Sequence, residues 1–458
     1  MLLSSPALLR RRRVNVCLHA SDGLSIEADG RTVESLSLAD IIGARAVDGS
    51  GRSFVEVFAY PKKRPGCDGG DGSEELRRFA RHVTVEIDPR GDGQENQPPV
   101  ISAKEWASTI RGLLGISQDT RKMLVFVNPF GGKGRARETF EVTMRPMLEQ
   151  AAIPFEVIIT EHAGHARDTM ANATNLATYR AVVAVGGDGM LAEVVDGVKL
   201  RSDSADVFRS LPLGIVCAGS GNGLCKSILA ESKEAFSTLA ATFVLIKGRA
   251  RRLDLSRVTT PSKPEGHLSF LSMGWAIVSD VDIESERLRC LGSLRFTVGA
   301  LQRIIFLRDY PGRLSYLPAT ETDGDLATAQ RGAVPLSEAL PDGWVTLEDR
   351  FVMVWICQTS HAAHDMNTSP NSTLDDGVFT ILLLRHTISR VTLLSMFLAI
   401  EQGTHLSNPA LEVVNAVAYR LEPLTPNGFY SLDGETIEYG PVHGTMEPGM
   451  ARVLSIPR

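Results

Sequence analysis

The sequence predicts three regions in order: a β-rich N-terminal region, an α/β lobe built on a doubly wound parallel sheet, and an antiparallel, β-rich C-terminal lobe. The main observation is that the period of the apolar residues changes twice along the 458-residue chain. Apolar and polar residues alternate at first, then continuous apolar runs alternate with helical patterns, and then the alternation returns. We therefore expect domains over 1–120, 121–250 and 251–458.

The first region contains short alternating runs, which are typical of half-buried antiparallel strands. These runs are VNVCLH (14–19), SFVEVFAY (53–60) and HVTVEID (82–88). A helix is expected over 102–114, with Trp106, Ile110 and Leu113 on one face. Several strands closed by one Trp-bearing helix resemble a pleckstrin-homology-like (PH-like) barrel. The stretches 61–75 and 88–99 are expected to be loops, and the cluster Lys62, Lys63, Arg64 belongs either to a solvated loop or to a contact with anionic lipid head groups.

The α/β lobe is predicted from four apolar runs separated by helical patterns. The runs are MLVFV (123–127), FEVIIT (155–160), AVVAV (181–185) and LGIVCA (213–218). Continuous apolar runs indicate strands buried on both faces, and their alternation with helices indicates a parallel sheet. Phe140, Met144, Met147 and Leu148 are expected on the buried face of the first helix. Ligands of such sheets bind at the carboxyl ends of the strands.

The C-terminal lobe is predicted from the return of alternating strands. They are HLSFLSMGW (267–275), RFVMVWICQ (350–358), VFTILLLR (378–385) and VVNAVAYRLEP (413–423), with FLSMGWAIV (270–278) as one apolar strand. An amphipathic helix, LRFTVGALQRIIF (294–306), interrupts them, either to gate a lipid tail or to pack in the core. The stretch 319–343 is expected to be a loop.

Composition excludes some classes of protein. The formal net charge is −6 (54 acidic and 48 basic residues), which argues against a general nucleic-acid binder. The six cysteines include no C-x-x-C pair and indicate reduced thiols in a cytosolic protein. No apolar run is long enough to span a bilayer, so we expect a cytoplasmic protein with peripheral membrane contact. A homodimer is compatible with the sequence.

Two glycine-rich segments open helices of the α/β lobe. NPFGGKGRAR (128–137) supplies backbone amides without a Cβ and the cation of Lys133, so it suits either a phosphate site or a tight turn. It is not a Walker A loop. AGSGNGL (218–224) fits neither G-x-G-x-x-G nor G-x-S-x-G. A zinc site at His361, His364 and Asp365 is disfavoured because no further ligands are near in the sequence.

A third segment, VGGDGMLAEV (185–194), places Asp188 among three glycines at a strand end. In isolation, such an Asp is commonly a helix N-cap. Three glycine-rich segments follow strands of one parallel sheet and therefore meet at one edge. There a carboxylate can bind Mg²⁺ through water or accept a hydroxyl proton, and this favours a catalytic role over a cap. Phosphoryl transfer needs amides and cations on the phosphates, a metal, and a carboxylate beside the attacking oxygen.

The series NPFGGKG, VGGDGMLAEVVDG, AGSGNGL and SLDGE (431–435) resembles the motifs of the diacylglycerol-kinase-type lipid kinases. The stretch LSMGWAIVSDVDIESERLRCLGSLRFTVG (271–299) resembles that of the sphingosine kinases. The similarity runs from about Lys122 to the C-terminus. It implies ATP and Mg²⁺ as cofactors and a sphingoid base lipid as substrate, which enters a pocket of the second lobe.

The resemblance also implies roles for individual residues. Asp188 is the expected general base, and Asp282 is the expected partner of the lipid amine. Together with Gly186, Gly187 and Gly189 they form the substrate site. The nucleotide site comprises Asn128, Pro129, Phe130, Gly131, Gly132, Lys133, Gly134, Thr160, Glu161, His162, Ala163, Gly164, Gly186, Glu193, Gly219, Ser220, Gly221, Arg289, Arg295, Asp433, Gly434 and Glu435, with Arg289 and Arg295 on the phosphates.

The sequence departs from the family at two positions. Phe130 stands where some members have arginine, and Leu211 where some have lysine, so one or two supplementary phosphate contacts are in doubt. The alternatives within enzymes are a ceramide or diacylglycerol kinase and, third, an NAD kinase. The alternative from another class is an inactive lipid-binding module. The presence of Asp188, Arg289, Arg295 and Asp433 argues against that last alternative.

Overall fold

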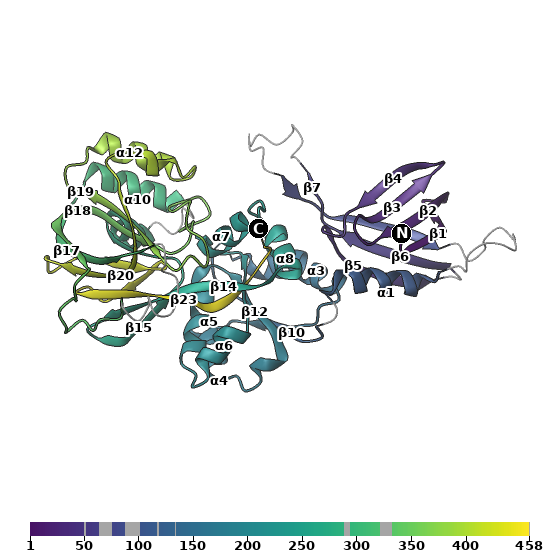
Figure 1. The fold of residues 1–458 in the computed structure, drawn as a ribbon, viewed down its shortest axis with the longest axis horizontal. Helices are drawn as coiled ribbons and strands as arrows, with labels where there is room; N and C mark the ends of the chain where they lie inside the picture. Colours follow the sequence, from purple (N-terminus) through teal and green to yellow (C-terminus); the bar gives the residue numbers. More distant parts are fainter. Residues whose placement is uncertain are drawn as a thin grey trace, which may run out of the picture.

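The three regions follow one another along the long axis of the molecule (Figure 1). The computed structural model describes residues 1–49, 52–63, 76–87, 101–116, 119–132, 134–287, 294–320 and 332–457. The N-terminal region lies at one end, the α/β lobe in the middle, and the C-terminal lobe at the other end. Separate apolar clusters fill the N-terminal region, the α/β lobe and the C-terminal lobe.

A seven-stranded antiparallel sheet forms the N-terminal region, in the order β4-β3-β2-β1-β9-β6-β5. Its strands are β1 Leu3–Leu9, β2 Arg12–His19, β3 Gly23–Ala28, β4 Arg31–Leu36, β5 Ile41–Gly49, β6 Arg52–Ala59 and β9 Arg81–Ile87. The short strands β7 (Lys62–Lys63) and β8 (Arg77–Arg78) pair separately. The three alternating runs of the sequence are therefore strands, as predicted.

Helix α1 (Ala103–Leu114) packs its first turns against this sheet. The Ser102 hydroxyl accepts the amide N–H of Glu105 at its start, and Gly115 ends it at φ 65°. Trp106 and Ile110 are buried as predicted, but Leu113 is 37% exposed. At the last turn of the helix the neighbouring Leu114 makes the apolar contacts with the two cores.

The α/β lobe contains four parallel strands in the order β11-β10-β12-β13. The strands are β10 Lys122–Val127, β11 Phe155–Ile159, β12 Tyr179–Gly186 and β13 Leu213–Cys217. The predicted parallel sheet is confirmed. The chain moves from β10 outward to β11 and then returns to the other side of β10, so the switch point of the topology lies between β10 and β12, where ligands of such sheets bind.

Helices connect these strands. They are α2 Ala136–Thr139, the π-helical turn η2 Phe140–Met144, α3 Arg145–Gln150, α4 His165–Asn172, the 3₁₀ turn η3 Leu176–Thr178, α5 Asp188–Lys199, α6 Ser204–Ser210, α7 Gly223–Glu231 and α8 Thr238–Lys247. Phe140, Met144, Met147 and Leu148 are all buried, as predicted.

The C-terminal lobe is rich in antiparallel strands, as predicted. Its elements are β14 Arg249–Thr260, β15 Lys263–Ser269, β16 Ser272–Ala276, α9 Ile277–Glu284, α10 Leu294–Ile305, β17 Tyr310–Pro318, β18 Val345–Cys357, β19 Phe379–Arg385, α12 Arg390–Ala399, the 3₁₀ turn η5 Thr404–Ser407, β20 Glu412–Pro423, β21 Tyr430–Leu432, β22 Glu435–Ile437 and β23 Val442–Ser455. The last strand, β23, pairs with β14 and β20 and also, in parallel, with β13. One fourteen-stranded sheet therefore runs through both lobes.

Two strand predictions for this lobe are wrong. The run 267–275 is divided into β15 and β16, because the amides of Phe270 and Leu271 turn toward the carboxylate of Asp433 instead of a neighbouring strand. The run 270–278 does not continue as a strand, because β16 ends at Ala276, which has φ 65°, and α9 begins at Ile277. Part of the predicted loop at 319–343 lies outside the described residues.

Among the described residues, no helix is both long and apolar enough to cross a bilayer. Cys17, Cys217, Cys225 and Cys357 are buried free thiols.

Candidate active site

Three glycine-rich loops meet at the switch point of the sheet. They follow β10 (128–134), β12 (186–189) and β13 (218–222). A Cβ added to Gly219 would lie 2.2 Å from the Cα of Gly187, and one added to Gly132 would lie 2.7 Å from the carbonyl oxygen of Ala218. The backbones of the loops therefore touch, and only glycine permits this approach. The structure thus brings together the three motifs that the sequence singled out.

The loop after β10 is shaped by Asn128. Its side-chain oxygen accepts the amide N–H groups of Phe130 (2.9 Å) and Gly131 (3.0 Å). Gly132 and Gly134 have positive φ values of 58° and 70°. The ring of Phe130 is 75% exposed. Lys133 lies outside the described residues.

Asp188 is the first residue of α5, but its carboxylate is bound to a different helix. The oxygens accept the amide N–H groups of Gly223 (2.8 Å) and Leu224 (3.2 Å), which open α7. The side chain is buried, and burial raises its pKa to about 6 against the opposing effect of these two hydrogen bonds. A carboxylate has about four lone-pair positions, so two remain for a proton or a hydroxyl group. A carboxyl group with this pKa is ionised at neutral pH and suited to act as a base.

Asp433 lies near Asp188 and comes from the C-terminal lobe. With Gly434 it forms the β21–β22 turn, at φ 52° and 89°, the positive values that a tight hairpin turn requires. Its carboxylate accepts hydrogen bonds from the Ser269 hydroxyl and from the amides of Phe270, Leu271 and Ser272. Its negative charge raises the pKa of Asp188 further. Asp433 therefore holds the β21–β22 turn on the segment between β15 and β16, close enough to Asp188 to act on its charge.

Glu435 reaches the same place. Its Oε1 lies 3.8 Å from the position that a Cβ on Gly189 would occupy, so the side chain contacts the first turn of α5. The sequence SLDGE thus contributes the turn at Asp433 and a carboxylate, that of Glu435, beside Gly189.

Asp282 lies on α9, and its carboxylate accepts the hydroxyl of Ser431 from β21. Burial raises the pKa of Asp282, whereas the positive charge of Arg295 lowers it. Arg295 is in the first turn of α10, and its guanidinium lies 4.4 Å from the ring centre of Phe296. One of its nitrogens, Nη1, is buried without a hydrogen-bond partner among the described residues. Arg289 lies outside the described residues.

The segment after β11 lies beside the end of β10, where the amide of Thr160 donates to the carbonyl of Val127. Thr160 is buried, and the amide of Glu161 donates to Nδ1 of His165 (3.1 Å). The ring of His162 stacks on that of His165. Gly164 precedes α4 at φ 83°. Glu193, on α5, accepts the amide of Ala166 at the start of α4 (3.2 Å), so it links two of the helices that carry the site.

Sequence reasoning missed the role of Asn222 and of the segment around His364. Asn222, at φ 60°, binds both the amide and the carbonyl of Gly219. The amide of His364 donates to the carbonyl of Gly221 (2.8 Å). The sequence S-G-N-G contained a signal for the role of Asn222, because Asn between two glycines tolerates the left-handed conformation that this turn requires. His361 is buried and burial lowers its pKa to about 4, which makes it a neutral structural residue.

The structure also shows where the two residues that depart from the family pattern lie. Leu211 is buried in the core of the α/β lobe, just before β13, and Phe130 is at the surface. Neither position therefore supplies a cation to the glycine-rich loops.

Comparison with known proteins identifies the family. Residues 122–258 match the diacylglycerol kinase catalytic domain, and residues 273–455 match the YegS C-terminal NAD kinase beta sandwich-like domain. Sphingosine kinase 1 of Arabidopsis thaliana is 33% identical over 96% of this chain and 91% of its own length. The chain belongs to the sphingosine kinase family. Human sphingosine kinase 2 is 30% identical over 88% of this chain and 82% of its own length.

A solved structure agrees on the fold. A putative diacylglycerol kinase from Bacillus anthracis superimposes with a TM-score of 0.53 over 74% of this chain and 98% of its own, at 18% identity. The two lobes are thus the diacylglycerol-kinase-like fold, with the N-terminal antiparallel sheet as an addition in front.

Proposed function

We propose that this member of the sphingosine kinase family transfers the γ-phosphoryl group of ATP to the primary hydroxyl of a sphingoid base. The observation that carries the proposal is the buried, ionisable Asp188 at the switch point, where three glycine-rich loops meet. Asp188 accepts the hydroxyl proton, the hydroxyl oxygen attacks the γ-phosphorus, and the bond from that phosphorus to the β–γ bridging oxygen breaks. The products are a sphingoid base 1-phosphate and ADP.

The loops after β10, β11 and β13 supply the nucleotide site in this proposal. Their residues are those expected from the sequence: 128–134, 160–164 and 219–221, with Gly186 and Glu193 beside them. The C-terminal lobe contributes the remaining residues of this proposed site: Arg289, Arg295, Asp433, Gly434 and Glu435. Transfer to an oxygen nucleophile depends on positioning and on stabilising the charge of the phosphoryl group, which the loops and the arginines provide.

Mg²⁺ is expected to enter with the phosphates of ATP. The described residues contain no group of three or more His, Cys, Asp or Glu side chains that could hold a metal ion. Asp188 and Asp433 already accept backbone hydrogen bonds. Mg²⁺ is commonly held through substrate phosphates and water with one or two carboxylates, so a site completed by ATP fits these residues. When bound, the ion would neutralise charge on the phosphates.

Asp282 is the proposed partner of the lipid amine. Its side chain is half-buried, and the charge of Glu435 also raises its pKa, so Asp282 lies in the same acidic neighbourhood as the base. A partly desolvated carboxylate forms a charge-assisted bond with an ammonium group. Ceramide carries an amide and diacylglycerol no nitrogen, so this residue favours the free base over the substrates of the alternative kinases.

Replacing Arg295 by Ala should raise the KM for ATP while leaving the lipid KM largely unchanged, because Nη1 of its guanidinium is buried without a hydrogen-bond partner among the described residues and is suited to a phosphate. Steady-state kinetics with each substrate varied in turn measures this. Arg303→Ala is the control, since Arg303 on the same helix is paired with Glu284. If only the lipid KM rises, Arg295 belongs to the lipid site.

We further propose peripheral membrane contact through α10 and α12, in a cytoplasmic protein. Val298, Leu301, Ile305 and Phe306 are between 41% and 66% exposed, and Val391 and Leu398 on α12 are exposed beside them. Single apolar residues at a surface are ordinary, but a contiguous group indicates an interaction. Val298→Glu with Leu301→Glu should reduce sedimentation with phosphatidylcholine/phosphatidylserine vesicles. Sedimentation equal to that of wild type would contradict this surface.

The N-terminal region is proposed to be a PH-like domain over 1–120, ahead of lobes at 121–250 and 251–458. Two observations support this. Strands β1 to β4 form a meander that continues through β9 into β6 and β5. One helix, α1, packs Trp106 into the core, and its indole N–H donates to the Ser5 hydroxyl (3.2 Å).

A further inference from the structure

Helix α7 (Gly223–Glu231) is held at its N-terminal end by the carboxylate of Asp188. The amides of Gly223 and Leu224, which have no partner inside the helix, both donate to it. A negative charge at this end is also favoured by the helix dipole. The position of α7 therefore decides how Asp188 is hydrogen-bonded.

The other end of α7 is closed by a rigid cap. Lys233 has φ 54°, its amide donates to the carbonyl of Ala230, and the amide of Glu234 donates to the carbonyl of Leu229. These are the two hydrogen bonds of a Schellman motif. Glu234 is thus fixed to the end of α7 and cannot move independently of it.

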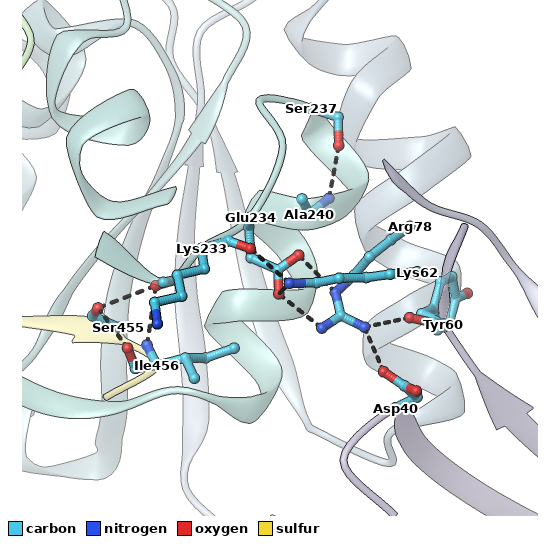
Figure 2. Close-up of polar contacts among 11 residues, drawn as sticks. Asp40, Tyr60, Lys62, Arg78, Lys233, Glu234, Ser237, Ala240, Ser455 and Ile456 are labelled. Atoms are coloured by element: carbon cyan, nitrogen blue, oxygen red, sulfur yellow. Dashed lines mark hydrogen bonds and ion pairs between the residues drawn. The ribbon is translucent and has the colours of Figure 1, made fainter. Parts of the chain in front are cut away.

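Two cations of the N-terminal region bind this cap (Figure 2). Arg78 of β8 donates from Nε and Nη2 to both oxygens of Glu234 (2.8 and 2.7 Å). Lys62 of β7 donates to the carbonyl of Lys233 (2.6 Å) and pairs with Glu234 (3.0 Å). The sequence cluster at Lys62 therefore contacts the α/β lobe, and Lys63 beside it is exposed. Arg64 lies outside the described residues.

This contact is buried and further braced. The side chains of Arg78 and Glu234 are 7% and 2% exposed. Arg78 also binds Asp40 (2.8 Å) and the carbonyl of Tyr60, and its guanidinium lies 3.5 Å from the ring centre of Phe243 on α8. A planar guanidinium is suited to such a combined bidentate and stacked contact, and lysine is not. Truncating one partner of such a pair leaves the other charge buried and unpaired.

We propose that Arg78 and Lys62 are positioning residues for phosphoryl transfer: they hold the end of α7, and thereby hold the first amides of α7 on the carboxylate of Asp188. The N-terminal region would then be part of the catalytic apparatus, not an independent appendage. This inference rests on the proposed function, because it treats Asp188 as the base.

The short length of α7 allows a displacement of its C-terminal end to move its N-terminal end as well. A nine-residue helix spans only about 13 Å, and a short helix moves as a unit. One flank borders a cavity of about 420 Å³ that Lys226, Ala230 and Lys233 help to line. The opposite flank is packed in the core of the α/β lobe, where Leu224, Ile228 and Leu229 are buried, so the contacts at the two ends add to this packing in fixing the helix.

A displacement of α7 should change the pKa of Asp188 in one direction. The amides of Gly223 and Leu224 lower the pKa of Asp188, while burial and Asp433 raise it. Among the described residues, the titratable groups that act on the carboxylate are Asp433 of the β21–β22 turn and Cys225 of α7, and Glu435 contacts the neighbouring Gly189. None of these is a cation, so weakening the two amide bonds would raise the pKa and leave less of the ionised base at a given pH.

The test uses full-length Arg78→Ala, with Arg78→Lys and Lys62→Ala as milder variants. We expect Arg78→Ala to lower kcat by about tenfold, with both KM values within about twofold of wild type. The acid limb of the pH profile should move upward, and amide hydrogen exchange should accelerate in peptides covering 222–231. Lys62→Ala should act in the same direction with a smaller effect, and Arg78→Lys should restore only part of kcat.

Two controls separate this from general destabilisation. Lys63→Ala changes the exposed neighbour on the same strand, and Arg45→Ala removes the ion pair with Glu56 on the sheet; neither should alter kcat or exchange in α7. Unchanged exchange in α7 for Arg78→Ala, or for Lys62→Ala if Arg78→Ala does not fold, would overturn the proposal. The exchange readout does not require kinase activity. If Arg78→Ala accelerates exchange in α7 but wild type phosphorylates no sphingoid base, the mechanical link stands and the proposed function fails.

Discussion

Replacing Asp188 by Asn should lower turnover by about 10²–10⁴-fold, because an amide cannot accept the proton of the lipid hydroxyl. ATP should still bind, since the nucleotide loops are unchanged. Both carboxylate oxygens accept amides of α7, and Asn preserves only one acceptor. A loss of stability of about 1–3 kcal/mol is therefore also expected, and activity must be measured well below the melting temperature.

The pH profile of the wild type provides the matching control. The ionised form of Asp188 is the base, and its pKa is raised to about 6. kcat/KM should therefore be nearly constant above that pH and fall below it. Turnover of Asp188→Asn above about a tenth of wild type, in folded protein, would be incompatible with a general base. A loss of activity fully explained by unfolding would reduce Asp188 to a cap of α7.

Replacing Asp282 by Asn should weaken the use of sphingosine by about 10–100-fold through the lipid KM, with little change in the KM for ATP. The substitution keeps an oxygen for the Ser431 hydroxyl and removes the charge that attracts the ammonium group. Kinetics with sphingosine and N-acylated sphingosine measures it. The wild type should use the acylated lipid poorly.

Asp280→Asn is the matched control, because Asp280 lies on the same helix but is already occupied by the hydroxyl of Tyr310. It should affect stability more than lipid selectivity. An unchanged lipid KM in Asp282→Asn, or equal effects of the two substitutions, would show that Asp282 does not recognise the amine.

The sequence predicted the α/β lobe well because each of its strands is a continuous apolar run. A strand that is buried on both faces is apolar at every position, so its sequence is not mistaken for an alternating, half-buried strand. Met123 to Val127 are accordingly all buried. The glycine loops were found for a similar reason, since close backbone approach at Gly187 and Gly219 tolerates no side chain.

Contacts between distant segments could not be predicted in this way. The separation of β15 from β16 depends on Asp433, more than 160 residues away, whose carboxylate takes the amides of Phe270 to Ser272. The binding of the Asp188 carboxylate to the first amides of α7 could likewise not be seen in the sequence, because the two segments are 35 residues apart. The pairing of β13 with β23 joins strands that are far apart in the chain, and no local pattern specifies such a neighbour.

The most direct test of the central claim is transfer of label from γ-labelled ATP with Mg²⁺ to a panel of lipids by the purified full-length protein. The panel comprises sphingosine, dihydrosphingosine, phytosphingosine, ceramide and diacylglycerol. We expect label in one or more of the three free bases, little in ceramide or diacylglycerol, and none with Asp188→Asn. Labelling of ceramide or diacylglycerol in preference to every free base, or of no lipid at all, would contradict a sphingoid base kinase.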